Sequence, residues 1–216
     1  MADPADLRRD YATGTLADDD VGDDPFALFA RWFEEAVGAG LVEPNGMTLA
    51  TADAAGRPSA RVVLLKGFDR SGFRWFTNYE SRKAADLTAN PHAALLFWFD
   101  RLERQIRIEG VVERVPEAVS DDYFAKRPRG SRIGAWASPQ SRPVAHRDEL
   151  DRLERETAAR FGDGEVPRPP HWGGFKLVPR AFEFWQGRSA RLHDRFRFTR
   201  RSSGDGEGWN RQRLAP

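Results

Sequence analysis

The feature that most constrains the fold is a series of strand-length segments joined by short turns. Turns this short join antiparallel neighbours, because a parallel pair needs a crossover of about a dozen residues or more. The series therefore predicts an antiparallel meander as the start of the sheet. Its three segments lie at residues 47–52, 59–66 and 73–78, separated by turns at 53–58 and 69–72.

The rest of the chain adds more strand patterns and several helices. Residues 92–99 are nearly all apolar, which is typical of a strand buried on both faces. Residues 103–111 alternate Ile106 and Ile108 with polar side chains, which indicates one buried face. Further strands are expected at 175–178, 181–186, 196–199 and 209–214, and helices at 25–38, 81–90, 146–161 and after Pro116.

These patterns predict a single domain over residues 25–216, mainly β with surrounding helices, folded as a closed or split antiparallel barrel. The chain has 216 residues and contains no internal repeats. Residues 1–24 are rich in Asp, Ala and Gly with few large apolar side chains, so we expect a flexible N-terminal arm.

Composition excludes several classes of site. The chain has no cysteine, and its four histidines form no His-x-x-x-His pair, so we expect no thiol chemistry and no metal site. A net charge of +1 argues against nucleic acid as a partner. No apolar run is long enough to cross a bilayer, so a cytoplasmic location without membrane contact is expected.

The arginines of the 146–161 helix have a simpler explanation than nucleic-acid binding. Acidic residues precede basic ones by four positions, and this spacing stabilises an exposed helix by ion pairing. The expected pairs are Asp148 with Arg152, Asp151 with Arg155, and Glu156 with Arg160.

Residues 185–195 are the most suggestive stretch for function. Arg191, His193 and Arg195 occupy every second position, so in an extended strand they would share one face. Such a surface favours a phosphate or carboxylate ligand. The alternative is a solvated edge strand whose charges prevent pairing with other chains.

Two further clusters of donors suit phosphate groups. Ser81 can cap a helix whose first turn carries Arg82 and Lys83, where free amide donors already attract anions. Arg61 and Lys66 lie five positions apart, so they can serve one site only if a bulge or the strand end redirects one of them.

A second cluster lies further along the chain. Tyr123 and Arg127 are four apart and should share a helical face. Together with Ser131 and Lys66 they would form a compact donor cluster for one phosphate. Gln105 could bind a planar heterocycle or simply face water.

Taken together, these motifs resemble the pyridoxine/pyridoxamine 5′-phosphate oxidase family. The resemblance runs in the family's order along nearly the whole chain. It rests on residues 61–66, 81–83, 104–105, 127–129, 131–136, 140–141, 184–187 and 191–195, flanked by the arm at 8–11 and the closing residues 213–216.

The resemblance implies an antiparallel split β-barrel that binds flavin mononucleotide (FMN) in clefts between the subunits of a homodimer. It implies that Gln140, Ser141, Trp185 and Arg195 come from the partner subunit. The implied FMN-binding residues are Arg61, Val62, Val63, Leu64, Leu65, Lys66, Phe76, Thr77, Arg82, Lys83, Gln105, Gln140, Ser141, Trp185 and Arg195.

The implied substrate site uses a separate set of residues. Lys66, Tyr123, Arg127 and Ser131 would hold the substrate phosphate. Arg191, Leu192 and His193 would contact the pyridine ring, with Arg191 and His193 as the catalytic pair. Arg8 and Tyr11 of the arm would close over the site as a lid.

The implied reaction oxidises pyridoxine or pyridoxamine 5′-phosphate to pyridoxal 5′-phosphate, with O2 reduced to H2O2. Two alternatives stay open. A split-barrel reductase that uses a flavin or deazaflavin on another substrate would keep the FMN set but has no need for Tyr123, Arg127, Ser131 and residues 191–193. A non-enzymatic pyridoxal phosphate carrier would bind the product without flavin absorbance.

Overall fold

A computed structural model describes residues 3–7, 9–202 and 207–216; the expected lid residue Arg8 lies outside the described residues. Nine strands form one sheet in which every strand pair is antiparallel. The strands are β1 Gly46–Ala52, β2 Pro58–Leu64, β3 Gly67–Asp69, β4 Gly72–Asn78, β5 His92–Phe99, β6 Arg104–Arg114, β7 Trp172–Gln186, β8 Asp194–Arg200 and β9 Trp209–Leu214.

The strand order confirms an antiparallel split barrel but corrects the predicted meander. The sheet runs β2-β1-β5-β6-β7-β4-β3, with β8 and β9 branching from β7, and it is not closed. β4 pairs with β7 rather than with β2. Short turns fix only the pairing of immediate neighbours, here β1 with β2 and β3 with β4. Between these hairpins the chain changes direction after Leu64.

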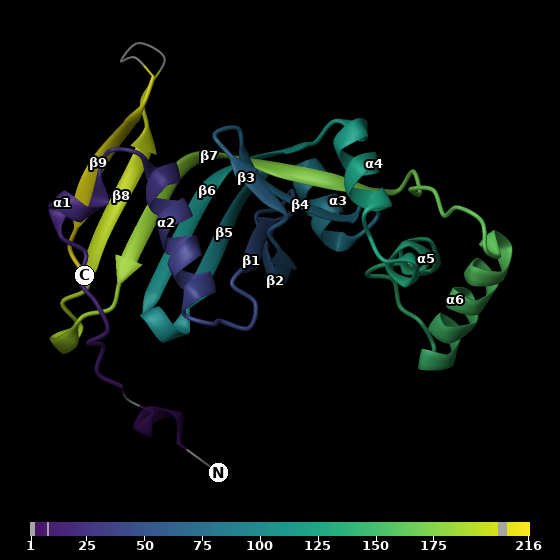
Figure 1. The fold of residues 1–216 in the computed structure, drawn as a ribbon, viewed down its shortest axis with the longest axis horizontal. Helices are drawn as coiled ribbons and strands as arrows, with labels where there is room; N and C mark the ends of the chain where they lie inside the picture. Colours follow the sequence, from purple (N-terminus) through teal and green to yellow (C-terminus); the bar gives the residue numbers. More distant parts are fainter. Residues whose placement is uncertain (1–2, 8, 203–206) are drawn as a thin grey trace.

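The core lies between the sheet and α2 (Pro25–Gly38), which crosses one face of the sheet in Figure 1. Asp24 caps this helix, which was predicted at the same residues, by accepting the N–H of Phe26 at 3.0 Å. Phe29 packs edge-on against Phe97, and Trp32 packs edge-on against Phe184. These aromatic contacts bury one side of α2 in the core.

The opposite face of the sheet, called here the outer face, carries polar and aromatic side chains. Phe97 on β5 is fully buried, but the next residue, Trp98, is 46% exposed. The prediction that this strand is buried on both faces was therefore wrong for the single chain, since α2 covers only one face. The alternation predicted on β6 is confirmed, with Ile106 and Ile108 buried.

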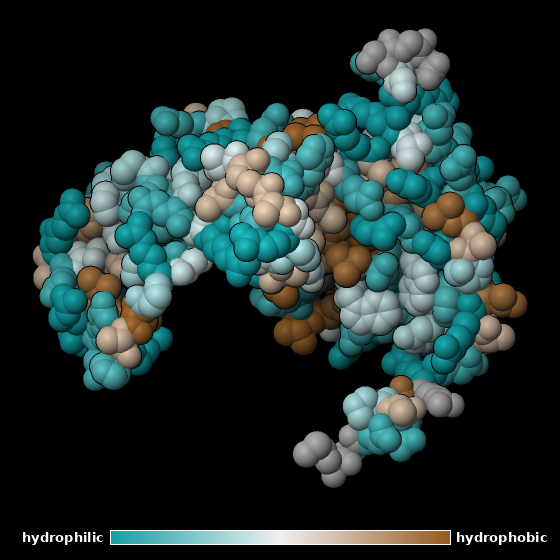
Figure 2. Space-filling model, turned by 180° about the vertical axis from the view of Figure 1, so that it is seen from behind, coloured by the Kyte–Doolittle hydropathy of each residue, from teal (hydrophilic) through white to brown (hydrophobic). Residues whose placement is uncertain are grey.

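Three helices form a lobe at one end of the sheet, beside the long strand β7 (Figure 1). A deep notch separates the lobe from the rest of the molecule, as seen from behind in Figure 2. The lobe consists of α4 Glu117–Ala125, α5 Arg129–Ala137 and α6 Arg147–Phe161, whereas α3 Arg82–Ala89 packs beside β1.

Three expectations about this lobe need correction. The α5 helix covers residues that the sequence patterns left without a helix. Arg127 lies two residues beyond the end of α4, so Tyr123 and Arg127 do not share a helical face. The ion pairs in α6 join Arg147 to Asp151 and Arg152 to Glu156, in the order base before acid. Glu156 thus pairs with the arginine on the preceding turn rather than with Arg160.

Residues 185–195 do not form a single extended strand. β7 ends at Gln186, a short 3-10 turn η3 follows at Ser189–Arg191, and β8 begins at Asp194. Ala190 and Arg191 both have positive φ angles, 53° and 61°. The chain therefore reverses direction here, which the alternation of charges did not reveal, and the predicted shared face of Arg191, His193 and Arg195 is wrong.

The described part of the arm follows the surface beside this reversal. It contains η1 Pro4–Asp6 and α1 Asp18–Val21, and η2 Asp100–Leu102 lies near it between β5 and β6. Leu16 and Val21 are buried in the core. Leu16 donates its N–H to Asp194 at 3.1 Å. The flexibility of residues 1–24 stays a prediction, but Leu16 and Val21 pack against the core.

None of the helices in the described ranges combines the length and apolar character needed to cross a membrane.

Candidate functional site

A cavity of about 570 Å³ lies between the sheet edge and the lobe. Its walls come from β2, β4, α3 and the α4–α5 region, so the fold brings together segments that are far apart in sequence. Many of the predicted site residues line it. The lining comprises Arg61, Val62, Val63, Leu64, Lys66, Phe76, Thr77, Lys83, Tyr123, Arg127, Pro128, Ser131, Gln140 and Trp172.

Arg61 is fixed in one orientation by its own sheet. Its guanidinium donates to the hydroxyls of Thr51 and Ser59, both at 2.7 Å, and pairs with the buried Asp86 at 3.6 Å. Burial, opposed by Asp86, lowers the pKa of Arg61 below its ordinary value. A partly desolvated cation that cannot move is suited to bind an anion at this edge of the sheet.

Lys83 is the most perturbed group in the cavity. Its ammonium donates to Gln140 Oε1 at 2.9 Å and to Thr77 Oγ1 at 3.1 Å. Burial, with a smaller contribution from the charge of Arg61, lowers the pKa of Lys83 to about 8. None of its three hydrogen-bond partners in the described structure carries a charge. An anionic ligand would therefore stabilise the charged form of Lys83.

Aromatic rings support the other side of the cavity. Phe76 stacks on Tyr123 at 3.9 Å and on Trp172 at 5.6 Å between ring centroids. Arg127 lies over the Trp172 ring at 4.6 Å, and its Nη1 is buried without a hydrogen-bond partner in the described structure. Burial lowers the pKa of Arg127. A buried guanidinium nitrogen without an acceptor indicates a site for a ligand oxygen.

Lys66 joins this cavity because β2 ends two residues earlier. Its backbone N–H donates to the carbonyl of Arg74 at 2.8 Å, which turns the chain out of the strand. Arg61 and Lys66 both line the cavity, although five residues separate them. The geometric condition predicted from the sequence, redirection at a strand end, is therefore met.

Residues at the reversal between β7 and β8 line a second cavity of about 580 Å³. Figure 1 shows this reversal at the opposite end of the sheet from the lobe. Tyr11, Arg191 and His193 all lie there, together with Arg9 and Arg188. Within one chain, Arg191 and His193 are thus separated from Lys66, Tyr123, Arg127 and Ser131.

His193 has a defined orientation in this second cavity. Its Nδ1 accepts the backbone N–H of Arg188 at 3.1 Å, and its ring lies 4.6 Å from that of Trp185. Burial, assisted by the charge of Arg191, lowers the pKa of His193. A neutral His193 with Nδ1 as acceptor carries its proton on Nε2 and can donate it to a ligand.

Three of the predicted FMN-binding residues form a row across the outer face. Gln105 on β6 is paired with Trp185 on β7, which is paired with Arg195 on β8. The row lies outside the lining of both cavities. Gln140 accepts from Lys83 of its own chain, and its expected contribution from a partner subunit stays a prediction.

The remaining predicted residues are placed less directly. Leu65 is buried in the core, and Leu192 is exposed at the reversal. Arg82 and Ser141 are exposed and line neither cavity, although the charge of Arg82 contributes to lowering the pKa of Arg61. Sequence reasoning missed Trp172, because a lone aromatic residue after a proline-rich connection carries no motif.

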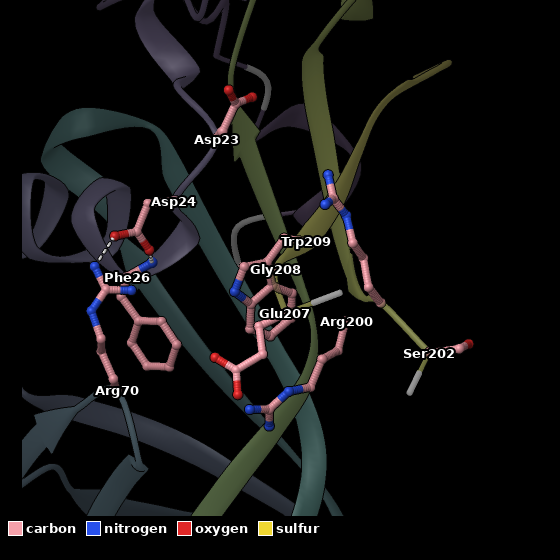
Figure 3. Close-up of a pocket in the computed structure, with 10 residues that line it drawn as sticks. Asp23, Asp24, Phe26, Arg70, Arg200, Ser202, Glu207, Gly208 and Trp209 are labelled. Carbon is pink, nitrogen blue, oxygen red and sulfur yellow. Dashed lines mark hydrogen bonds and ion pairs between the residues drawn. The ribbon is translucent and has the colours of Figure 1, made fainter. Parts of the chain in front are cut away.

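A larger cavity of about 920 Å³ lies elsewhere, between the start of α2 and the β8–β9 hairpin (Figure 3). Its charges balance: Arg70, Arg200 and Arg201 face Asp23, Asp24 and Glu207. Arg70 is already paired with Asp24 at 2.6 Å. We therefore assign no ligand to it, despite its volume. The described residues also contain no group of three or more His, Cys, Asp or Glu side chains that could hold a metal ion.

Comparisons with known proteins place the chain in a sequence family. Residues 33–159 match a family described as pyridoxamine 5′-phosphate oxidase. Residues 172–216 match one described as the pyridoxine 5′-phosphate oxidase C-terminal dimerisation region. A pyridoxine/pyridoxamine 5′-phosphate oxidase of Cupriavidus necator is 60% identical over 216 residues, covering 100% of both chains. One from Bordetella pertussis is 58% identical and covers 98% of this chain and 99% of its own.

Solved structures agree on the fold. PhzG from Burkholderia lata 383, in complex with tetrahydrophenazine-1-carboxylic acid, is 33% identical, with a TM-score of 0.85 over 94% of this chain and 98% of that one. A pyridoxamine 5′-phosphate oxidase-related, FMN-binding protein from Nostoc punctiforme has a TM-score of 0.70 over 90% of this chain and 100% of its own. At 17% identity the latter comparison supports the fold alone.

Proposed function

The chain belongs to the pyridoxamine 5′-phosphate oxidase family, and we propose from this premise that it is an FMN-dependent oxidase of pyridoxamine and pyridoxine 5′-phosphates. The products would be pyridoxal 5′-phosphate and H2O2; with the amine substrate, loss of the hydride gives an imine, which water hydrolyses to the aldehyde and ammonia. The observation that carries the proposal is the single cavity with two separate sets of phosphate donors, Arg61 with Lys83 and Lys66 with Arg127.

The first donor set suits the phosphate of FMN. Arg61 is held by its hydrogen bonds, and Lys83 is a partly buried ammonium without an acidic hydrogen-bond partner. β2, which carries Val62 to Leu64, is an end strand of the described sheet. Its outward backbone groups are available to hydrogen-bond a flat heteroaromatic ring. When bound, the flavin would take a hydride from C4′ of the substrate and pass the electrons to O2.

The second donor set suits the phosphate of the substrate. Lys66, Tyr123, Arg127 and Ser131 line the same cavity, and the buried Nη1 of Arg127 lacks an acceptor in the described structure. Stacking on Trp172 holds the guanidinium plane, so its donors keep a fixed direction. We propose that these four groups hold the phosphate and so set the distance of the substrate carbon from the flavin.

Arg191 and His193 would contact the pyridine ring from a second chain. In one chain they lie in the other cavity, so they can meet Lys66 and Arg127 only in a homodimer. The match of residues 172–216 to a dimerisation region supports this arrangement. His193 would donate from Nε2 to a substrate substituent, and Tyr11 beside it would exclude water. Trp185 and Arg195 would reach the cofactor from the partner chain, whereas Ser141, next to Gln140, would reach it within its own chain.

The similarity to PhzG raises a second candidate, oxidation of a reduced phenazine carboxylic acid. The ligand named in that structure carries a carboxylate and no phosphate. The described cavity offers Lys66, Tyr123, Arg127 and Ser131 around one anion position, which is more donors than a carboxylate needs. The full-length relatives at 58–60% identity also favour the phosphorylated substrate.

The experiment is an aerobic assay on purified protein reconstituted with FMN. We expect a flavin spectrum, and pyridoxal 5′-phosphate and H2O2 in equal amounts when pyridoxamine 5′-phosphate is added. Unphosphorylated pyridoxamine and a tetrahydrophenazine carboxylic acid serve as competing substrates. A protein that binds no FMN, or turns over the carboxylic acid in preference, would contradict the proposal. Bound flavin without peroxide would indicate a reductase, and aldehyde binding without flavin a carrier.

A further inference from the structure

Glu183 is a buried carboxylate on the outer face with no role in the site described so far. It lies on β7 two residues before Trp185, and its side chain is 5% exposed. A charged group this deep needs ion pairs or several hydrogen bonds to offset its lost hydration. Its partners therefore indicate why an acid is present at this position.

Both oxygens of Glu183 are occupied by arginines from the neighbouring strands. Oε1 accepts from Nε of Arg195 at 3.0 Å and from Nη2 of the same residue at 2.8 Å. Oε2 accepts from Nη2 of Arg107 at 2.6 Å. The carboxylate thus bridges β6 and β8 across β7, and it grips one edge of the Arg195 guanidinium.

The remaining donors of Arg195 can be counted. A guanidinium has five N–H groups in a rigid plane. Two of them bond Glu183, and a third, on Nη1, bonds the carbonyl of Ala215 at 2.8 Å. Two N–H groups are therefore left, one on each terminal nitrogen, and the 26% exposure of this side chain leaves them within reach of a ligand.

We propose that Glu183 is a positioning residue that acts through Arg195. By holding Nε and Nη2, it fixes the orientation of the Arg195 guanidinium, and so of its two remaining N–H groups, at the end of the row that contains Trp185 and Gln105. This inference rests on the proposed function, in which Arg195 contacts FMN. Glu183 itself does not touch the cofactor.

A purely structural ion pair is the alternative, and Glu109 provides the matched control. Glu109 lies on the same face and pairs with Arg107 at 3.0 Å and Arg197 at 3.9 Å, but it makes no recorded contact with Arg195. At 42% exposure it is far more hydrated than Glu183. Removing its charge tests the loss of an ion pair on this face without releasing Arg195.

The experiment measures FMN affinity by flavin fluorescence on apoprotein, for wild type, Glu183→Gln and Glu109→Gln. Losing two charge-assisted hydrogen bonds that orient Arg195 should weaken FMN binding about tenfold or more in Glu183→Gln. Glu109→Gln should stay within about twofold, as expected for an exposed pair. Glu183→Asp keeps the negative charge but withdraws both carboxylate oxygens by one methylene, so it can no longer hold Arg195 in the same orientation, and weakened FMN binding is expected there too.

A double-mutant cycle separates positioning from general stabilisation. If Glu183 acts through Arg195, then Glu183→Gln should cause no further loss of FMN affinity in an Arg195→Ala background. Fully additive losses, or equal losses in Glu183→Gln and Glu109→Gln, would overturn the inference. If wild type, Glu183→Gln and Glu183→Asp all bind FMN equally well, the inference is overturned, but the proposed function is not. Wild type that binds no FMN would overturn the proposed function as well.

Discussion

Lys83 makes the cavity sensitive to pH. Its pKa of about 8 lies well below the ordinary value of a lysine, because burial disfavours the ammonium. A phosphate dianion favours the protonated form, so above pH 8 binding must be accompanied by proton uptake. FMN affinity should therefore fall as pH rises above about 8, by up to about tenfold per pH unit.

Fluorescence titrations of apoprotein with FMN between about pH 7 and about pH 9.5 measure this, since the phosphate itself stays dianionic over that range. Lys83→Arg serves as the control, because a guanidinium keeps its charge and should remove the pH dependence. A wild-type affinity that does not change with pH would contradict the assignment of Lys83 to the cofactor phosphate.

Arg127 distinguishes the substrate phosphate from the cofactor phosphate. Arg127→Lys removes the planar group that stacks on Trp172 and the buried Nη1. We expect KM for pyridoxamine 5′-phosphate to rise by about tenfold or more, with FMN affinity nearly unchanged. The neighbouring Lys126 is exposed and lines neither site cavity, so Lys126→Ala should leave both constants unchanged. Loss of FMN binding in Arg127→Lys would show that Arg127 binds the cofactor phosphate and not the substrate phosphate.

The sequence identified the hydrogen-bond donors of the first cavity, but not the residues that hold functional arginines in place. Arg61, Lys66 and Lys83 were identified from their spacing and motifs, and all three line one cavity. Trp172, Asp86 and Glu183 were not identified, since each acts through a contact made only after folding. A pattern along the chain reports which residues share a strand or helix, but not which buried acid faces which arginine.

Among the elements, the connection between β7 and β8 shows the limit of alternation as a signal. Charges at every second position predicted a strand, but Gly187 and the left-handed pair Ala190 and Arg191 turn the chain instead. A Cβ atom on Gly187 would lie 2.9 Å from the Tyr11 side chain, so the arm packs against this turn at close range. Positive φ at two consecutive non-glycine residues is strained, and strain of this kind is typical of functional turns.

The N-terminal arm is tied to the sheet through Glu103. This buried carboxylate accepts from Arg9 Nη2 at 2.7 Å and from the N–H of Thr13 at 3.0 Å. Burial alone would raise its pKa, but these hydrogen bonds hold the pKa of Glu103 below its ordinary value. The attachment is therefore present at neutral pH and is lost as pH falls through the lowered pKa.

Glu103→Gln should release the arm at neutral pH. We expect trypsin to cleave after Arg9 roughly fivefold faster or more in this variant, because charge-assisted hydrogen bonds oppose local opening. Thr15→Ala changes an exposed arm residue outside the hydrogen bonds of Glu103, so it should be cleaved at the wild-type rate. Equal cleavage in wild type and Glu103→Gln would mean that the contact does not hold the arm, and the expected flexible arm would then be the better description.

Across the whole molecule, the predicted substrate-binding residues lie in two cavities at opposite ends of the sheet. If a homodimer joins them, the complete site takes Arg127 from one chain and Arg191 from the other. Arg127→Ala and Arg191→Ala should each be nearly inactive alone, with FMN still bound by Arg191→Ala. Random hybrids of the two variants should recover about a quarter of wild-type activity, because half are mixed dimers with one intact site.

Sedimentation analysis should give a particle of twice the 24.4 kDa chain mass in every case. No recovery of activity in the hybrids would show that both arginines act within one chain, and a monomeric particle would contradict the shared site altogether. The fold class itself was predictable from turns and alternation, but the division of the site was not, because strand patterns contain no information on distances across the sheet.

The most direct test of the oxidase assignment is a single turnover without oxygen. FMN-loaded protein is mixed with excess pyridoxamine 5′-phosphate under anaerobic conditions, and the flavin spectrum and the aldehyde are followed together. We predict that the flavin is bleached, that one pyridoxal 5′-phosphate forms for each flavin, and that H2O2 and flavin colour appear only when air is admitted. A flavin that stays oxidised in the presence of this substrate would contradict the account.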